Sequence, residues 1–234
     1  MAAGYALGVD LGTTSVKVVL LNCSSKAVEQ SFIQPSDASV PESSTSPGAQ
    51  GADEQDVKRI VECLDYCMDQ LDENKLKLVT RIGVCGQMHG CVLWKAGKDS
   101  RLEANPSTGR GNHSGQVVAC TDGMPLFVSH GKLQFSGTVS NLYTWQDGRC
   151  SEEFLASLPG PAGPIPLSTG FGCATLAWLK VYMPEVLATY DMAGTVMDFI
   201  TCGLTGLHGP KMSTHNAVGW GYCDPNHMVW DKEM

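Results

Sequence analysis

The sequence predicts an α/β fold in which a mixed sheet is flanked by helices. Two apolar runs, at 7–9 and 16–21, surround a turn of small polar residues, which is the pattern of a β-hairpin. A third alternating run follows at 26–33. An amphipathic stretch at 53–74 then precedes an apolar run at 78–85, so the expected order is three strands, a helix and a strand.

The composition indicates a globular protein that acts on small molecules. The 234 residues are 43% hydrophobic and 17% charged, which fits one large domain or two small ones. A net charge of −8 without a basic stripe argues against nucleic-acid binding. No run approaches the ~18 apolar residues of a membrane-spanning helix, and the first five residues do not resemble a signal peptide. We therefore expect a cytoplasmic protein without a membrane partner.

The elements of the first half follow from local patterns. Residues 53–74 place their apolar side chains on one helical face and carry acidic residues in the opening turn. The run at 78–85 is expected to be a buried strand. Residues 34–52 are rich in Pro, Ser and Gly with little that packs, so they are expected to form a surface loop. Residues 95–141 show no sustained period and are expected to form a long loop or insertion.

The second half is predicted to be mainly helical. A short helix is expected at 151–158, capped by Ser151, with two more at 174–182 and 185–190. A further apolar helix is expected at 195–204.

The turn of the first hairpin carries the strongest chemical signal. Gly12 permits a tight turn, and the hydroxyl and backbone N–H groups of Thr13, Thr14 and Ser15 are suited to an anion. The carboxylate of Asp10 is placed to hold a cation over the same spot. Phosphate with a metal ion is the natural ligand of such a turn. The alternative is an ordinary hairpin whose polar turn is solvated.

The string from Gly8 to Lys17 resembles the first phosphate motif of the actin-like ATPases, which include sugar kinases, heat-shock 70 chaperones and actin. The resemblance implies an actin-like (ribonuclease H-like) fold. The order of three strands, a helix and a strand supports this fold independently of the motif.

Two later strings narrow the resemblance to the carbohydrate kinases of the glycerol kinase, xylulokinase and gluconokinase group. They are Gly-Gln-Met-His-Gly at 86–90 and Thr-Trp-Gln-Asp-Gly-Arg-Cys at 144–150. The detail of residues 145–159 and 169–175 resembles the sedoheptulokinases among them. The resemblance implies transfer of the γ-phosphoryl group of ATP, with Mg²⁺, to the terminal hydroxyl of a seven-carbon ketose.

The resemblance assigns roles to the residues of the turn. Asp10 would hold Mg²⁺ and serve the phosphates. The phosphate-binding residues would be Gly12, Thr13, Thr14, Ser15 and Lys17.

The string at 86–90 follows a predicted strand end, where α/β sheets present loops that contact ligands. By resemblance to the ketose-binding motif of xylulokinase-like enzymes, Gln87, Met88, His89 and Gly90 would bind the sugar. The alternative for His89 is a structural histidine whose ring is satisfied within the protein.

Trp145 offers a flat apolar face on which a sugar ring can stack, and Asp147 can pair with hydroxyl groups. The alternative is that Trp145 is a core residue and that Asp147 forms a structural ion pair with Arg149. For Arg149 the structural alternative is favoured, and for Trp145 the substrate role is favoured. By resemblance, Asn216 would also bind the sugar.

A catalytic base is expected in the segment 212–217, where the resemblance places an aspartate. This sequence has Thr214 at that position. A threonine hydroxyl is not an effective base near neutral pH. The adjacent His215 titrates in the right range and is a possible substitute.

Kinases of this group close two actin-like domains over the nucleotide, and the residues up to Met234 show no second phosphate loop. The sequence is therefore interpreted as the amino-terminal, sugar-binding domain of a heptulose kinase, spanning 1–234, with the carboxy-terminal nucleotide domain absent. One alternative is a non-catalytic sugar-binding protein, either truncated or a degenerate kinase. Another is a xylulokinase-like pentulose kinase.

Overall fold

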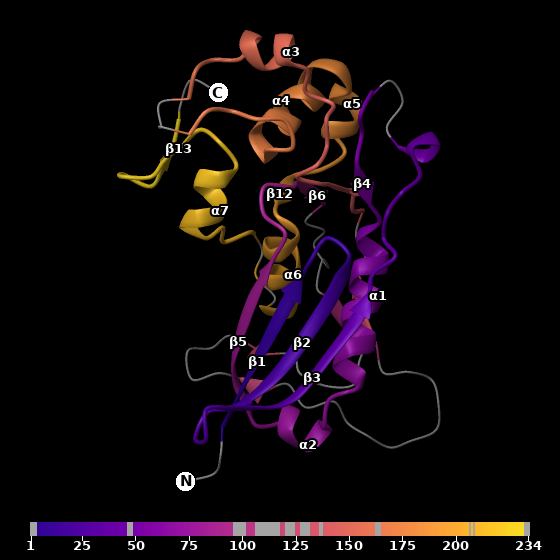
Figure 1. The fold of residues 1–234 in the computed structure, drawn as a ribbon, viewed down its shortest axis with the longest axis vertical. Helices are drawn as coiled ribbons and strands as arrows, with labels where there is room; N and C mark the ends of the chain where they lie inside the picture. The colour runs from indigo at the N-terminus through magenta and orange to yellow at the C-terminus, as the bar shows by residue number, and fades with distance from the viewer. Residues whose placement is uncertain are drawn as a thin grey trace.

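A computed structural model describes residues 4–45, 49–95, 102–105, 118–119, 125–126, 132–135, 138–161, 165–205, 207 and 209–231. Its main feature is a four-stranded sheet in the order β3-β2-β1-β5 (Figure 1). The strands are β1 (Tyr5–Leu11), β2 (Ser15–Asn22), β3 (Ala27–Pro35) and β5 (Val79–Gly86). Because β1 is antiparallel to β2 and parallel to β5, the sheet is mixed, as the sequence predicts.

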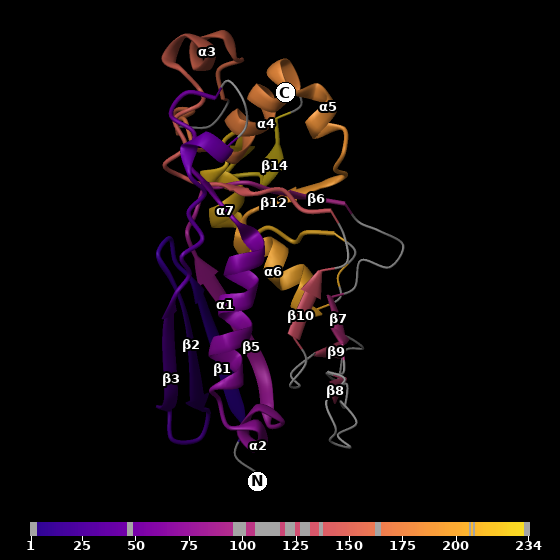
Figure 2. The same ribbon diagram turned by 90° about the vertical axis from the view of Figure 1, so that its right-hand side faces the viewer.

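One face of this sheet packs against helices. Side chains alternate along β1, so that Tyr5, Leu7, Val9 and Leu11 are all buried on the same face. Helix α1 (Val57–Asp69) lies along the sheet, and α6 (Val196–Thr205) contributes to the same core (Figures 1 and 2). The predicted helix at 195–204 is thereby confirmed within one residue at each end.

The helix expected over 53–74 is shorter than predicted at both ends. Asp56 caps the amino end of α1, where its side chain accepts a hydrogen bond from the backbone N–H of Lys58. Residues Glu54–Gln55 form a short strand, β4, and Glu73–Leu76 form a separate one-turn helix, α2. The acidic side chains therefore stop the helix at its boundaries instead of lying in its opening turn.

Residues 78–85 were expected to form a buried strand. The strand is present, but it is not buried on both faces. Strand β5 lies at the edge of the sheet, and Arg81, Gly83 and Cys85 are exposed. Its apolar residues pack on the core side only, since Ile82 and Val84 are partly buried against the core.

The two predicted loops contain more structure than expected. Within 34–52, Ala38 and Ala49 are buried, and Glu42–Ser44 form a short 3₁₀ helix, η1. Most of 95–141 lies outside the described residues. Its described parts include short paired strands, β7 with β10 and β8 with β9. Their bounds are β7 (Leu102–Asn105), β8 (Val118–Ala119), β9 (Pro125–Leu126) and β10 (Lys132–Phe135).

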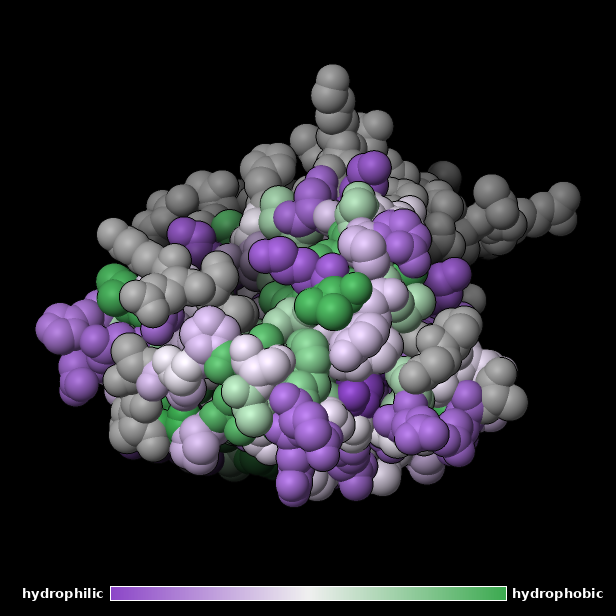
Figure 3. All heavy atoms as spheres, turned by 90° about the horizontal axis from the view of Figure 1, so that it is seen from above, coloured by the Kyte–Doolittle hydropathy of each residue, from purple (hydrophilic) through white to green (hydrophobic). Residues whose placement is uncertain are grey.

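A second core joins the helices of the second half. The helices predicted at 151–158 and 174–182 are confirmed, with Ser151 capping the first of them, whereas the one predicted at 185–190 is a single turn that ends at Leu187. They are α3 (Glu152–Ser157), α4 (Gly172–Tyr182) and α5 (Pro184–Leu187). Hydrophobic side chains (green) also reach the surface in the view onto this end of the molecule (Figure 3).

Short strands that the sequence analysis did not predict hold the two cores together. Strand β6 (Val92–Trp94) pairs with β12 (Met192–Gly194), and β4 pairs with β11 (Leu142–Tyr143). The last described elements are α7 (Thr214–Gly219), β13 (Cys223–Asp224) and β14 (Val229–Trp230). In the part of the chain that the structure describes, no helix is long and apolar enough to cross a membrane.

Candidate functional site

The β1–β2 turn is built as the sequence predicts. Asp10, near the end of β1, lies opposite Lys17 on β2, and the Lys17 Nζ is 3.3 Å from the Asp10 Oδ2. The backbone N–H of Gly12 donates to the carbonyl of Ser15 over 3.0 Å, which closes the turn. Thr14 is exposed, and within the described ranges the hydroxyl groups of Thr14 and Ser15 have no hydrogen-bond partner. The turn therefore presents a carboxylate and free hydroxyl groups at its surface.

The loop that follows β5 lies beside this turn. Because β1 and β5 are parallel neighbours, their carboxyl ends meet, and the backbone N–H of Gln87 donates to the carbonyl of Leu11 over 2.9 Å. Gly86 allows this approach, since a Cβ at that position would lie 2.5 Å from the Leu11 carbonyl oxygen. The structure thus brings the predicted phosphate turn and the start of the predicted sugar loop together.

Gln55 is a site residue that the sequence analysis missed. Its Nε2 donates to the carbonyl of Thr13 over 2.7 Å, and its Oε1 accepts from the Nε2 of Gln87 over 2.9 Å. The Gln55 side chain is buried on β4. No local signal marked it, because a single glutamine in a polar stretch before a helix carries no periodic pattern.

Trp145 reaches the same turn from the second half of the chain. Its indole Nε1 donates to the Thr13 Oγ1 over 3.1 Å, and its side chain is 46% exposed. The alternative that Trp145 is a core residue is therefore wrong. Gly170, which has a φ of +77°, lies against the Trp145 backbone, where a Cβ would clash with the Trp145 carbonyl oxygen. The exposed ring is thus held at the edge of the phosphate turn.

His89 is half-buried and held by two contacts. Its Nδ1 is 2.6 Å from the carbonyl oxygen of Gly219, and its ring stacks on Phe171 with centroids 4.7 Å apart. Because a carbonyl only accepts, Nδ1 carries the hydrogen and the neutral ring keeps Nε2 as an acceptor. The backbone of His89 is left-handed, with a φ of 69°. Met88, beside it, has an exposed side chain.

The backbone around Gly90 is tightly packed. A Cβ at Gly90 would lie 2.7 Å from the Tyr143 carbonyl oxygen, and the Gly90 carbonyl accepts from the Trp220 Nε1 over 3.2 Å. Packing therefore accounts for a glycine at position 90, since only glycine fits between these groups, and its predicted contact with sugar stays a prediction.

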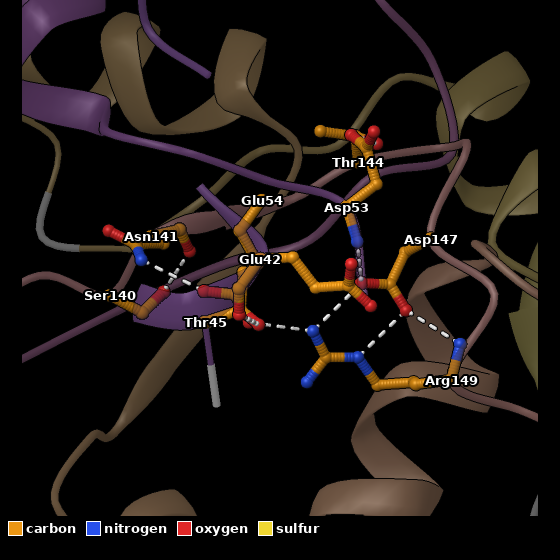
Figure 4. Close-up of polar contacts among 9 residues, drawn as sticks. All are labelled: Glu42, Thr45, Asp53, Glu54, Ser140, Asn141, Thr144, Asp147 and Arg149. Atoms are coloured by element: carbon orange, nitrogen blue, oxygen red, sulfur yellow. Dashed lines mark hydrogen bonds and ion pairs between the residues drawn. The ribbon is translucent and has the colours of Figure 1, made fainter. Parts of the chain in front are cut away.

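A buried charge network joins Arg149, Asp147 and Glu54 (Figure 4). The guanidinium of Arg149 pairs with Asp147 over 2.7 Å and with Glu54 over 2.7 Å, and all three side chains are buried. Burial alone would lower the pKa of Arg149, but hydrogen bonds and charge attraction to Asp147 and Glu54 outweigh this effect and raise it. The second carboxylate oxygen of Glu54 accepts from the Asn141 side chain. The structural role favoured for Arg149 fits this arrangement.

Asp147 does not fit its predicted role in sugar binding. It is fully buried, and its carboxylate accepts from the backbone N–H groups of Asp53 and Arg149 as well as from the Arg149 side chain. Both of its oxygens are therefore occupied by donors within the protein. Its place is structural, because it ties the segment after Trp145 to the strand before α1.

Helix α7 carries three of the predicted residues. Asn216 is buried and its Nδ2 donates to the Thr195 Oγ1 over 3.4 Å, so this side chain joins α7 to the start of α6. Thr195 also bonds Asp198, whose pKa is raised by burial although the Thr195 hydrogen bonds oppose the shift. This bond gives Asn216 a structural role, and its predicted contact with sugar stays a prediction. Thr214 and His215 are exposed in the first turn of α7.

The donor set at the turn fits a magnesium ion that is bound mainly by phosphates. Among the described residues there is no group of three His, Cys, Asp or Glu side chains that could hold a metal ion. Mg²⁺ commonly takes one or two protein carboxylates and completes its shell with phosphate oxygens and water. Asp10, half-exposed beside the free hydroxyl groups of the turn, supplies one such carboxylate.

Comparisons with known proteins all find similarity to carbohydrate kinases. Residues 5–104 match the N-terminal domain of the FGGY family of carbohydrate kinases. The chain is 42% identical to the sedoheptulokinase of Homo sapiens, over 99% of this chain and 45% of that protein. It is 26% identical to the xylulose kinase of Escherichia coli (strain K12), over 97% of this chain and 38% of that protein. The chain thus spans less than half the length of these curated relatives.

A solved structure gives the same fold. The glycerol kinase of Plasmodium falciparum, determined with ADP, superposes with a TM-score of 0.65 and 19% identity, covering 98% of this chain and 40% of that one. At this identity the likeness shows the fold alone. It is the actin-like ATPase fold that the sequence predicts.

Proposed function

We propose that the protein phosphorylates sedoheptulose to sedoheptulose 7-phosphate with ATP, because residues 5–104 match the N-terminal domain of the FGGY family of carbohydrate kinases. The observation that carries the proposal is the convergence on Thr13. Gln55 and Trp145 both donate hydrogen bonds to this residue of the phosphate turn, and Gln55 also bonds Gln87. A sugar and a phosphate donor that use these groups are held side by side.

Positioning is the main task of a phosphoryl-transfer site. On the sugar side, Trp145 offers an exposed ring for stacking and His89 offers Nε2 as an acceptor for a hydroxyl group. On the phosphate side, Thr14 and Ser15 offer hydroxyl groups. Asp10 would hold Mg²⁺, which neutralises phosphate charge when it is bound.

The names of the relatives support a choice of substrate class. The human relative is named for sedoheptulose, and the bacterial relative at lower identity is named for xylulose. A heptulose is therefore the first candidate and a pentulose the second.

A sugar-binding protein without kinase activity is a further candidate. The observation that favours it is Thr214, which stands where the resemblance places a carboxylate base. Exposed in the first turn of α7, Thr214 makes no side-chain hydrogen bond within the described part of the chain.

The test is sugar-dependent release of ADP by the protein purified from its source, with sedoheptulose, xylulose and glycerol offered separately. We expect sedoheptulose to give the highest rate, and Asp10→Asn to remove it. A higher rate with xylulose would move the assignment to a pentulose kinase. Calorimetric binding of sedoheptulose without ADP release would support the non-catalytic candidate. The absence of both sedoheptulose binding and ADP release would overturn the proposal.

A further inference from the structure

Three carbonyl and amide groups form a chain of hydrogen bonds with a fixed direction beneath the phosphate turn. The Thr13 carbonyl can only accept, so Gln55 must present its Nε2 to it, at 2.7 Å. The Oε1 of Gln55 then faces Gln87, which must present its own Nε2, at 2.9 Å. The backbone carbonyl of Thr13 therefore sets the amide orientation of Gln87 through the Gln55 side chain.

This direction leaves one acceptor unused. Gln87 is only 8% exposed, and its Oε1 is buried without a hydrogen-bond partner among the described residues. A buried acceptor without a donor lowers stability, and such groups in native proteins point to a missing partner. The Gln87 Nε2 is already committed to Gln55, so the amide cannot turn to place its nitrogen at the free position. The free atom is an oxygen that only accepts, so its missing partner must be a hydrogen-bond donor.

Gln55 is itself held firmly. It lies beside Glu54, whose carboxylate pairs with the buried guanidinium of Arg149 and with the Asn141 side chain. Strand β4, which carries both residues, pairs with β11 through Gln55 and Leu142. The backbone of Gln55 is therefore anchored, which holds its amide within reach of both Thr13 and Gln87.

We propose that Gln55 is a positioning residue that fixes the Gln87 amide with its oxygen as the free acceptor, so that the site selects a sugar hydroxyl acting as a donor. The inference rests on the proposed function and deepens it. Because the Gln87 oxygen is buried, the proposal requires that the side chains covering it move to admit the hydroxyl. A carboxylate or an ether oxygen at the same place is disfavoured, since neither donates a hydrogen bond.

The arrangement of the two glutamines can be tested without a ligand. In nuclear magnetic resonance spectra of the wild-type chain, the side-chain amide protons of Gln55 and Gln87 should exchange slowly with solvent. Gln55→Leu should remove the protection at Gln87, because leucine offers neither an acceptor to the Gln87 Nε2 nor a donor to the Thr13 carbonyl. Fast exchange at Gln87 in the wild-type chain would overturn the inference.

Selection of a donor is tested by calorimetry with sedoheptulose and a set of analogues in which one hydroxyl at a time is replaced by fluorine. Fluorine keeps the size but cannot donate. In the wild-type chain, replacement at one position should weaken binding about 10-fold. In Gln55→Leu the freed amide can turn, so this penalty should fall to about twofold or less.

Gln70→Leu is the matched control. Gln70 also donates to a backbone carbonyl, that of Tyr66, but it is exposed at the end of α1. It should retain the wild-type penalty. If Gln55→Leu does not fold, Gln87→Leu takes its place, since removal of the acceptor must also abolish the penalty.

The failure of this inference differs from failure of the proposed function. If the wild-type chain binds sedoheptulose with no penalty for any fluorine, or if Gln55→Leu keeps the full penalty, the role of Gln55 is wrong and the kinase proposal stands. If the wild-type chain neither binds sedoheptulose nor releases ADP, the kinase proposal fails, and donor selection for sugar fails with it.

Discussion

The indole nitrogen of Trp145 lies 3.1 Å from the hydroxyl oxygen of Thr13, a residue 132 positions earlier in the chain. This bond links the turn of the main sheet to the segment that follows β11. Because the ring is 46% exposed, the bond orients a surface residue instead of filling the core. Its main effect is therefore expected on ligand binding.

Trp145→Phe keeps an aromatic face and removes the N–H donor. We expect sedoheptulose affinity to fall severalfold, while the free energy of unfolding changes by about 1 kcal/mol or less. Calorimetry and urea unfolding measure the two effects. Trp230→Phe is the control, because Trp230 is also 46% exposed but lies on β14. Equal losses of affinity in both variants would contradict a specific role for Trp145.

Arg149→Met should be the most destabilising of these changes. It leaves the buried carboxylates of Glu54 and Asp147 without their cation, and breaking a buried pair in this way typically costs about 3–5 kcal/mol. Urea unfolding measures the loss. Lys77→Met removes one partner of an exposed pair with Glu73 and should cost about 1 kcal/mol or less. A similar small loss for Arg149→Met would show that the network relaxes or hydrates.

His89→Ala removes both the bond to Gly219 and the stack on Phe171. It also places alanine at a φ of 69°, which disfavours residues with a Cβ. We expect a loss of about 1–3 kcal/mol in unfolding free energy together with weaker sugar binding. His89→Asn should be less destabilising, since asparagine tolerates this backbone region. Sugar affinity unchanged in both variants would assign His89 a structural role only.

Asp198→Asn should change the pH dependence of stability. Burial raises the pKa of Asp198, so the folded state keeps this proton to a higher pH than the unfolded state does. The stability that the protonated group contributes is complete below the ordinary value near 3.8 and is lost as pH rises through the folded pKa. The stability of the wild type relative to the variant should therefore fall as the pH rises above about 4. Urea unfolding across this range measures it, and a relative stability that rises with pH would contradict the direction of the shift.

Asp10→Asn should abolish magnesium-dependent nucleotide binding without unfolding the protein. Asp10 is half-exposed, and its ion pair with Lys17 across the hairpin lies at the surface, so this pair contributes little to stability. Calorimetric titration with ATP, with Mg²⁺ and with a chelator, measures the effect. Equal magnesium dependence in wild type and variant would show that Asp10 does not hold the ion.

Local patterns predicted most of the fold. The alternating strands β1 and β2 and the capped helix α3 were readable because their side chains repeat at strand or helix periods. Strands β4 and β12 were not predicted, because two or three residues show no period and their partners, Leu142 and Trp94, are distant in sequence.

The site was predicted less completely than the fold. The meeting of the Thr13 turn with Gln87 follows from the parallel pairing of two predicted strands. The buried positions of Asp147 and Asn216 did not follow, because a motif does not reveal which donors the rest of the chain supplies. The Asp147 carboxylate, for example, accepts from the backbone of a residue 94 positions away.

The separations along the chain also set the order in which the site is completed. The bond between Gly12 and Ser15 closes within a local hairpin, whereas those from Gln55 and Trp145 to Thr13 span 42 and 132 residues. Local hairpins form quickly and long-range contacts are slower. During synthesis on the ribosome, the turn is therefore made 132 residues before Trp145, which contacts it. A ligand that bridges Thr13 and Trp145 should consequently slow unfolding of the finished chain without speeding its folding.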